Sequence, residues 1–528
     1  CYDPARLALL IDIYLTAPET ETALRALAGL AIALFRYRRR PLPSDVAQRL
    51  QAARDTDRWA TDFADLATEL LRARDTERIT AKMRDELYPG LMKLQDDLRD
   101  KIDRGDLDLG ALAADGNPEW DDMLRRDGLG DKLREMSEIQ ADGGDVFLAA
   151  FSHLKQFPFF RDISHWFLPY HDDHTAVAAL DGLDGQLGTL LRRMPLLCDS
   201  DKYSVVLSIA QMPDQQRHSA FGAMRAQSDQ AAEMLDNLHA GDPRAARRDI
   251  LNKYIQNLYR FHTLFRRKGE FFDPFAAGID IFDLAPLADG FDDTDTLRTA
   301  GEFALRHRLW TEAARLLEHV DRLSDPDARR AQQIGYCYES LGDTDRAISR
   351  YDEAELLDPA SCWTLRRLAA AWRRKGRPDK ALPYYRRLAD SLPDDFRTTL
   401  NLAFALTEAG RYDDALQQFH KAAYYDPDSL QALRGLAWTQ YITRRLDRAA
   451  ESYRRIIDTD PRPADYLNAG HVARALGDTP AAIDRYRSYM RAADITPDRL
   501  LADLDRDAQW LDNPADNILY VQTITSRQ

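Results

Sequence analysis

The residues best suited to chemistry lie together in one stretch, 151–174, of a 528-residue chain. Four histidines fall within it, and Asp172 and Asp173 separate the last two, His171 and His174. Ligands three positions apart can share one helix face and hold zinc, but such a site needs a third and a fourth ligand at a recognisable spacing. The stretch offers neither, so we expect no metal site.

Sequence patterns of catalysis are missing elsewhere too. The chain has no P-loop, no glycine-rich dinucleotide motif after a strand, no zinc-protease helix and no serine-hydrolase elbow. Gly182, Gly185 and Gly188 interrupt a helical region, and acid pairs such as Asp121–Asp122 are expected by chance in a chain of net charge −15. A carboxylate becomes catalytic only when burial or a neighbour perturbs it. We therefore expect no enzyme and no cofactor.

The stretch 151–174 is also the densest in aromatic side chains, and two prolines interrupt it. One interpretation is a buried joint where two helical layers meet. The other is an exposed anchor for a partner, because tryptophan and tyrosine dominate interface hot spots. An enzyme whose site lies within 120–210 is a further alternative that the sequence leaves open.

Composition favours a mostly helical, soluble protein, with 30% charged residues and 25 glycines. The negative net charge argues against a nonspecific grip on nucleic acid, which needs a basic face. The most apolar run, Ala26–Phe35, is about half the ~20 residues that a membrane-spanning helix requires. The four cysteines form no C-x-x-C pair, so we expect small packing residues in a reducing cytoplasm. Cys1 leaves two alternatives, a piece of a longer protein or a lipid-anchored first residue.

Beyond residue 290, one spacing organises four classes of residue, which each recur every 34 positions. Chance would not hold four residue classes at one spacing, whereas an internal repeat of helix pairs would. The recurring residues are Gly342, Gly376 and Gly410; Ala347, Ala381, Ala415 and Ala449; Tyr351, Tyr385, Phe419 and Tyr453; Pro359, Pro393, Pro427 and Pro461.

Each repeat predicts two helices joined by a turn. Apolar residues at helical spacing form one face of the first helix, and Gly342 stands where a left-handed residue would end it. A second apolar stripe follows, and Pro359 closes the unit. Gly335 and Ala347 lie where the two helices should cross closely, with Tyr351 beside them.

These residues resemble the tetratricopeptide repeat (TPR) family. The fourth unit has Arg444 at the glycine position, and the unit before the clearest one has Arg308 there. A fifth full unit loses one residue before Gly477. We count about six units from near 294 to 497, so the resemblance implies an all-α fold, an α-solenoid at 291–498, with a capping helix and tail at 499–528.

The first region, 1–290, is predicted to be helical without a clean period. The helix pair within 4–40 has the look of a HEAT-type hairpin, and Arg36 with Arg38–Arg40 is expected to be a solvated helix end. The segments SHLKQFPFFRDISHWFLP and LLCDSDKYSVVLSIAQMP are similar to the N-terminal regions of large, uncharacterised bacterial TPR proteins.

In the TPR family, the first helix of each unit lines a concave groove that holds another protein. The resemblance implies that positions 2, 5, 6, 9 and 12 of each unit point into it. Arginine guanidinium groups can pair with carboxylates, and aromatic rings give rigid contact area. The alternative is that arginine is abundant in this chain, so some arginines face inward without a role in binding. Asn401 matches a position of TPR domains that clamp a chaperone's terminal carboxylate, but the lysines of that clamp are not matched. The expected lining is Tyr336, Arg366, Arg367, Arg373, Arg397, Asn401, Phe404, Arg434, Trp438, Tyr441, Asn468 and His471.

The favoured function is a non-catalytic scaffold or adaptor that holds a protein or peptide segment in this groove, and the arginines of the lining favour an acidic one. The alternatives are a cell-surface lipoprotein that binds glycan or peptide, and the enzyme with a site in 120–210. The sequence does not name the partner.

Overall fold

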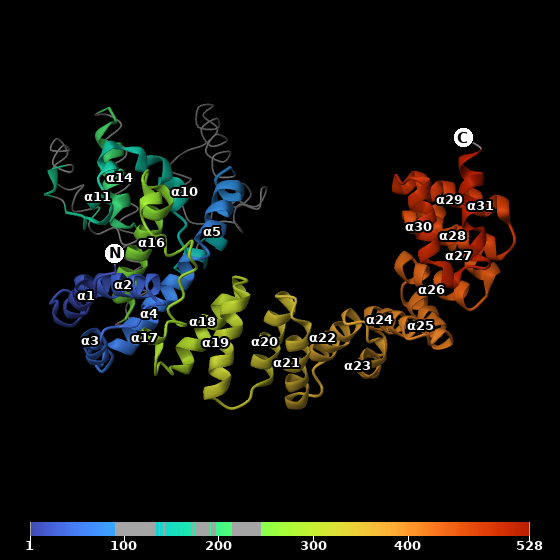
Figure 1. Cartoon of the computed structure of the whole chain (residues 1–528), viewed down its shortest axis with the longest axis horizontal. Helices are drawn as coiled ribbons and strands as arrows, with labels where there is room; N and C mark the ends of the chain where they lie inside the picture. Colours follow the sequence, from blue (N-terminus) through green and yellow to red (C-terminus); the bar gives the residue numbers. More distant parts are fainter. Residues whose placement is uncertain are drawn as a thin grey trace, which may run out of the picture. The chain divides into compact units, whose positions relative to one another are not determined.

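The computed structural model describes residues 2–89, 134–136, 138–140, 143–171, 173–175, 191, 197–213 and 244–526 (Figure 1). Regular structure in these residues is all helical. The chain divides into two compact units, Cys1–His307 (unit 1) and Arg308–Gln528 (unit 2). Residues 121–122 and 182–188 lie outside the described ranges.

Unit 1 is built from helices of unequal length without a repeating order. The first two, α1 and α2, pack against each other as the predicted hairpin, and Asp3 caps α1. The helices are α1 (Pro4–Thr16), α2 (Thr20–Arg36), α3 (Ser44–Arg54), α4 (Trp59–Ala73), α5 (Thr76–Lys82) with the π-helical turn η1 (Met83–Leu87), α10 (Leu148–Phe151), η2 (Ser152–Gln156), η3 (Pro158–Arg161), α11 (Ser164–Phe167), α14 (Asp199–Ala210), α16 (Ala245–Leu264), η4 (Lys268–Glu270), α17 (Ala285–Ala288) and α18 (Thr294–Arg306).

The aromatic stretch at 151–174 is a buried joint, the first of the two interpretations. Phe160, Trp166 and Tyr170 are buried, and they pack with Tyr203 of α14 and Phe261 of α16 in one apolar cluster. The prolines keep the helices here short, so that their rings turn inward from several directions. These rings hold distant parts of unit 1 together.

Buried charges lie beside this aromatic cluster. Asp201 bonds to Lys155 at 2.8 Å and to Arg260 at 2.9 Å, and Arg260 reaches Asp145 at 2.9 Å. Burial opposes ionisation of Asp201, but the charges of Arg260 and Lys155 outweigh it and lower its pKa. Burial raises the pKa of the neighbouring Cys198 thiol to about 11, so that thiol stays protonated.

The segment 269–293 has little regular structure. Several of its apolar side chains are nevertheless buried within unit 1, where Phe282 and Phe291 contact the ring of Phe63 in α4 at 5.9 and 4.8 Å between centroids. Burial of these rings holds the irregular backbone in place.

Unit 2 is a run of helix pairs whose bounds follow the sequence period. The first helices begin at 328, 362, 396 and 430 and then, one residue early, at 463; α18 begins at 294 in the same register, although it lies in unit 1. The helices are α19 (Trp310–Leu323), α20 (Ala328–Ser340), α21 (Thr344–Leu357), α22 (Cys362–Arg374), α23 (Pro378–Ser391), α24 (Phe396–Glu408), α25 (Tyr412–Tyr425), α26 (Leu430–Ile442), α27 (Leu446–Thr459), α28 (Pro463–Ala475) and α29 (Thr479–Ala493). This confirms the predicted solenoid of helix hairpins.

The turns inside the pairs need a left-handed residue. Gly342, Gly376 and Gly410 have φ of +80°, +70° and +73°, as a residue without Cβ permits. Arg308 and Arg444 stand at the same place in their units and both take φ of +61°. The left-handed backbone conformation is therefore kept in the two units where arginine replaces the glycine.

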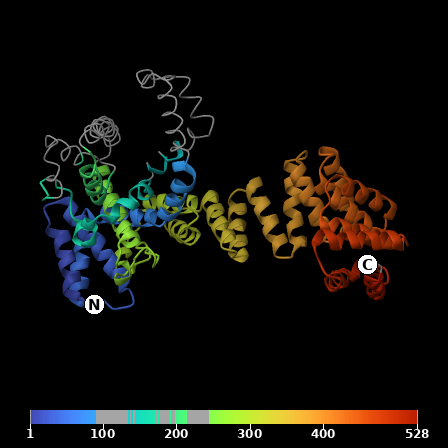
Figure 2. The same ribbon diagram turned by 90° about the horizontal axis from the view of Figure 1, so that it is seen from above.

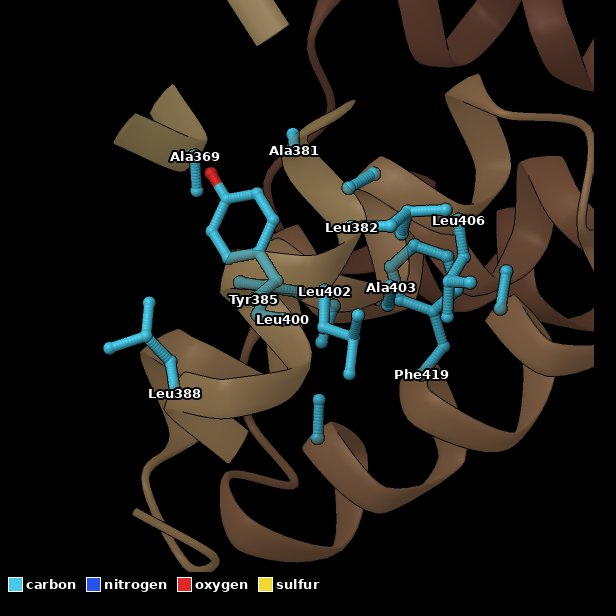
Figure 3. Packing of buried hydrophobic residues seen from close by; sticks show 14 of the residues in the cluster. Ala369, Ala381, Leu382, Tyr385, Leu388, Leu400, Leu402, Ala403, Leu406 and Phe419 are labelled. Carbon is cyan, nitrogen blue, oxygen red and sulfur yellow. The ribbon is translucent and has the colours of Figure 1, made fainter. Parts of the chain in front are cut away.

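Close crossing of the two helices in a pair depends on a small residue facing a ring. A Cβ added to Gly335 would lie 2.5 Å from Cε1 of Tyr351, and one added to Gly470 would lie 2.5 Å from Cε1 of Tyr486. In the middle repeats Ala369 and Ala403 take this place, within a continuous core shown in Figure 3. The predicted role of the small residues is confirmed.

After the last pair, the chain folds back onto the repeats. This C-terminal segment contains α30 (Pro497–Arg506), η5 (Ala508–Trp510), η6 (Pro514–Asp516) and α31 (Asn517–Thr525). Leu500 and Leu504 of α30 and Ile524 of α31 join the core of α28 and α29, and Figure 2 shows this segment beside the last repeats. Two helices, α30 and α31, therefore pack on the last repeats in this segment.

Candidate partner-binding face

The predicted lining residues lie on the first helices of five successive pairs, α20, α22, α24, α26 and α28, and we call this surface the first-helix face. Helix α26 contacts both α24 and α28, so first helices are direct neighbours there. The structure separates eight of the twelve residues into three groups.

The first group consists of arginines that internal carboxylates already hold. Arg367 bonds to Glu339 of the preceding repeat at 3.1 Å. Arg373 bonds through Nε to Glu408 of the following repeat at 2.8 Å, and this hydrogen bond raises the Arg373 pKa. Their charges serve contacts between repeats.

Arg434 belongs to the same group. Its Nε donates to both oxygens of Asp465 at 3.0 and 2.9 Å, and its Nη2 donates to the Asp460 carbonyl at 2.7 Å. Such bidentate pairing leaves few donors for a ligand. The carboxylates of these pairs were missed from sequence, although each stands about one repeat away from its arginine, a spacing that could have revealed them.

Arg366, Arg397 and Asn401 form the second group. All three side chains are exposed, and among the described residues none of them makes a hydrogen bond or an ion pair. The two arginines lie within electrostatic range of Asp395, the N-cap of α24, whose pKa is lowered mainly by hydrogen bonds from Thr398 and further by these two charges. Arg366 is on α22 and Arg397 is on α24. Their guanidinium donors are available to a ligand.

Aromatic rings flank these free groups. Tyr336 and Trp363 both lie 5.1 Å from the Arg367 guanidinium, and Trp363, which the sequence argument omitted, is 39% exposed. Phe404 is half-buried and packs on Phe419 at 5.2 Å between centroids. Trp363 is thus the ring with most area open to a partner on this part of the face.

The third group is covered by the C-terminal segment. Tyr441 is buried; its hydroxyl donates to the Trp510 carbonyl at 2.5 Å, and burial raises its pKa to about 12. The Trp438 ring lies 6.1 Å from that of Trp510. These side chains meet a part of the same chain rather than solvent.

His471 and Asn468 of α28 are turned toward the protein interior. His471 is fully buried, with Nδ1 3.0 Å from the Tyr486 hydroxyl and Nε2 3.4 Å from Asp507. Burial lowers the pKa of His471, so the imidazole is neutral. Asn468 hydrogen-bonds the buried hydroxyl of Tyr453. Neither offers a charged group to a ligand in this arrangement.

The histidine-rich stretch holds no cluster of ligands for a metal in the residues described around it. His165 stacks on Phe159 at 4.1 Å between centroids, and its Nδ1 lies 2.7 Å from the Phe159 carbonyl. No group of three histidine, cysteine or acidic side chains suited to a metal occurs in the described ranges, which leave out Asp172. Across those ranges, no helix combines the length and the apolar character that crossing a membrane requires.

Comparisons with known proteins concern the repeats. Family models described as tetratricopeptide repeat match residues 333–396, 373–436 and 406–470. No curated protein has a significantly similar sequence. Among solved structures, MamA 41-end from Desulfovibrio magneticus RS-1 is 22% identical, with 32% of this chain and 97% of that chain covered and a TM-score of 0.30.

A second solved structure, YrrB, is described as a TPR protein with an unusual peptide-binding site. It is 19% identical over 35% of this chain and 94% of that chain, with a TM-score of 0.32. The matched repeats, the register of the helices and the left-handed turns agree with one another. Residues 333–470 of the chain are tetratricopeptide repeats.

Proposed function

We propose that this protein is an interaction scaffold that binds an acidic peptide segment across the first helices α22 and α24. The observation that carries the proposal is the set Arg366, Arg397 and Asn401 on neighbouring first helices, which are exposed donors with no hydrogen-bond or ion-pair partner among the described residues. Repeat arrays present extended surfaces of this kind for partners.

The charges around these residues support an acidic ligand. In a chain of net charge −15, most arginines of the first-helix face are neutralised by carboxylates, as Arg373 is by Glu408. Arg366 and Arg397 have no such pair among the described residues, so a carboxylate on a partner can form charge-assisted pairs with them. Asn401 adds a neutral donor, and the Trp363 ring adds contact area.

The test is binding of fluorescein-labelled octaglutamate to the full chain, followed by fluorescence anisotropy. We expect the Arg366→Glu/Arg397→Glu variant to bind at least about tenfold more weakly, which corresponds to about 1.4 kcal/mol. Added salt should weaken wild-type binding, because exposed charges are screened.

A matched control carries the same change of net charge elsewhere. Arg386 of α23 and Arg455 of α27 are exposed arginines on second helices. The Arg386→Glu/Arg455→Glu variant should bind as the wild type does. Equal weakening in both double variants would show that only total charge matters and would refute the assignment to the first-helix face.

A further inference from the structure

The C-terminal segment occupies the first-helix face of the last two repeats. The Trp510 ring lies against that of Trp438, and the Trp510 carbonyl accepts a hydrogen bond from the Tyr441 hydroxyl. Trp438 and Tyr441 are both on α26. Asp507 lies 3.4 Å from Nε2 of His471 on α28. All three contacted residues belong to the predicted lining of the face.

Further contacts fix the chain after Trp510. Asp512 pairs with Arg444 at 2.9 Å, and the Asn513 carbonyl accepts from Arg474 of α28 at 2.5 Å. Leu511 between them has φ of −94° and ψ of 140°, an extended backbone. Residues 507–513 therefore lie across α26 and α28 as a short stretch held through acids, one aromatic ring and main-chain carbonyls.

The flanks of this stretch are anchored in a core that the stretch shares through Leu511. Leu500 and Leu504 on one side, and Val521 and Ile524 on the other, are buried with Leu511 in the core of α28 and α29. The ion pair of Asp512 with Arg444 is half-exposed on both partners, so it contributes about 0–1 kcal/mol. Displacing residues 507–513 therefore exposes Leu511, while the four flanking side chains still hold α30 and α31.

We propose that residues 507–513 occupy the first-helix face at α26 and α28 from within the same chain. A short acidic ligand then binds only along α20–α24, and a longer one must displace residues 507–513. This rests on the proposed function, because it concerns the length of ligand that the same face accepts.

Helix spacing sets the length at which displacement begins. Neighbouring packed helices lie about 8–10 Å apart, so the axes of α20, α22 and α24 span roughly 16–20 Å. An extended chain covers about 3.3 Å per residue, so this span takes about five to six residues. A segment longer than that meets Trp510 at α26.

The experiment uses hexaglutamate and hexadecaglutamate on the full chain, with anisotropy for affinity and hydrogen–deuterium exchange for residues 507–513. Hexaglutamate should bind and leave the exchange of 507–513 unchanged. Hexadecaglutamate should bind and raise it. In the Trp510→Ala/Asp512→Ala variant, affinity for hexadecaglutamate should rise about tenfold, while affinity for hexaglutamate should stay the same.

The control is Tyr424→Ala, which removes a ring that is 81% exposed on α25 and should alter neither affinity. Binding of hexadecaglutamate without a change in exchange at 507–513 would overturn the proposal. So would equal affinities of the Trp510→Ala/Asp512→Ala variant and the wild type for the long peptide. If neither peptide binds, the proposed function itself fails and this inference fails with it.

Discussion

Unit 1 and unit 2 stabilise their helices by different kinds of contact. Unit 1 brings Asp145, Lys155, Asp201 and Arg260 together in one buried group, from three separate parts of the sequence. Unit 2 makes the same small-residue-to-ring contact in successive pairs, as between Gly335 and Tyr351. In unit 1, a buried charge contributes to stability through a set of side-chain contacts that occurs once. In unit 2, a small residue contributes through a contact that its position in the repeat determines.

The largest expected effect concerns the buried charges of unit 1. Asp201→Ala leaves Lys155 and Arg260 buried without their shared carboxylate, which should cost about 3–5 kcal/mol. Urea unfolding followed by circular dichroism measures the loss. The control is Glu451→Ala in unit 2, which removes an ion pair of 2.7 Å with the exposed Arg454. This change should cost less than about 1 kcal/mol. Similar losses in the two variants would remove the proposed difference between the units.

A smaller effect tests the close helix crossings of unit 2. Gly435 lies against a ring, and a Cβ there would be 2.2 Å from Cε1 of Phe419. Gly435→Ala should therefore cost about 1–3 kcal/mol through overpacking, measured as a lower unfolding midpoint. In unit 1, a Cβ on Gly29 would meet Leu10 at an ordinary 3.6 Å. Gly29→Ala should stabilise α2 by about 0.5–1 kcal/mol, and a loss there would contradict the argument.

The smallest effect concerns the left-handed turns. Arg308→Gly should raise stability by about 0.5–1 kcal/mol, because the strain of a non-glycine residue at φ of +61° exceeds the entropy that glycine adds to the unfolded chain. Gly376→Ala, at φ of +70° with no atom near its Cβ position, should lower stability by about 1 kcal/mol. Thermal unfolding by calorimetry compares the two. Stability changes of the same sign in the two variants would show that the left-handed conformation does not determine which residue stands at the turn.

The repeat period made the fold of unit 2 predictable to the residue. It located the turn at Arg444 although the expected glycine is absent, and it located the small residue at Gly335. Such inference works because each contact recurs between neighbours at a fixed distance in sequence. The pairing of Arg373 with Glu408 was not predicted, because it joins two repeats: Glu408 lies 35 residues after Arg373.

The cover over Tyr441 and His471 was not predictable in the same way. Asp507 and Trp510 lie beyond the last repeat, so no period relates them to α26 or α28. The buried charges of unit 1 share this property, since nothing in the spacing of Lys155, Asp201 and Arg260 brings them together. Whether the open residues Arg366, Arg397 and Asn401 bind a partner stays a prediction.

The repeat geometry also determines where the protein can grow. A copy of residues 362–395 inserted after Asp395 would give α22 and α23 neighbours of the kind they already have, because the next unit presents Ala403 and Phe419 where they present Ala369 and Tyr385. The C-terminal segment fits only one place, since Trp510 and Asp507 contact residues particular to α26 and α28. A unit added after α29 would separate the cap from that place. Duplication can thus lengthen the array from its middle, while its C-terminal end is closed to extension.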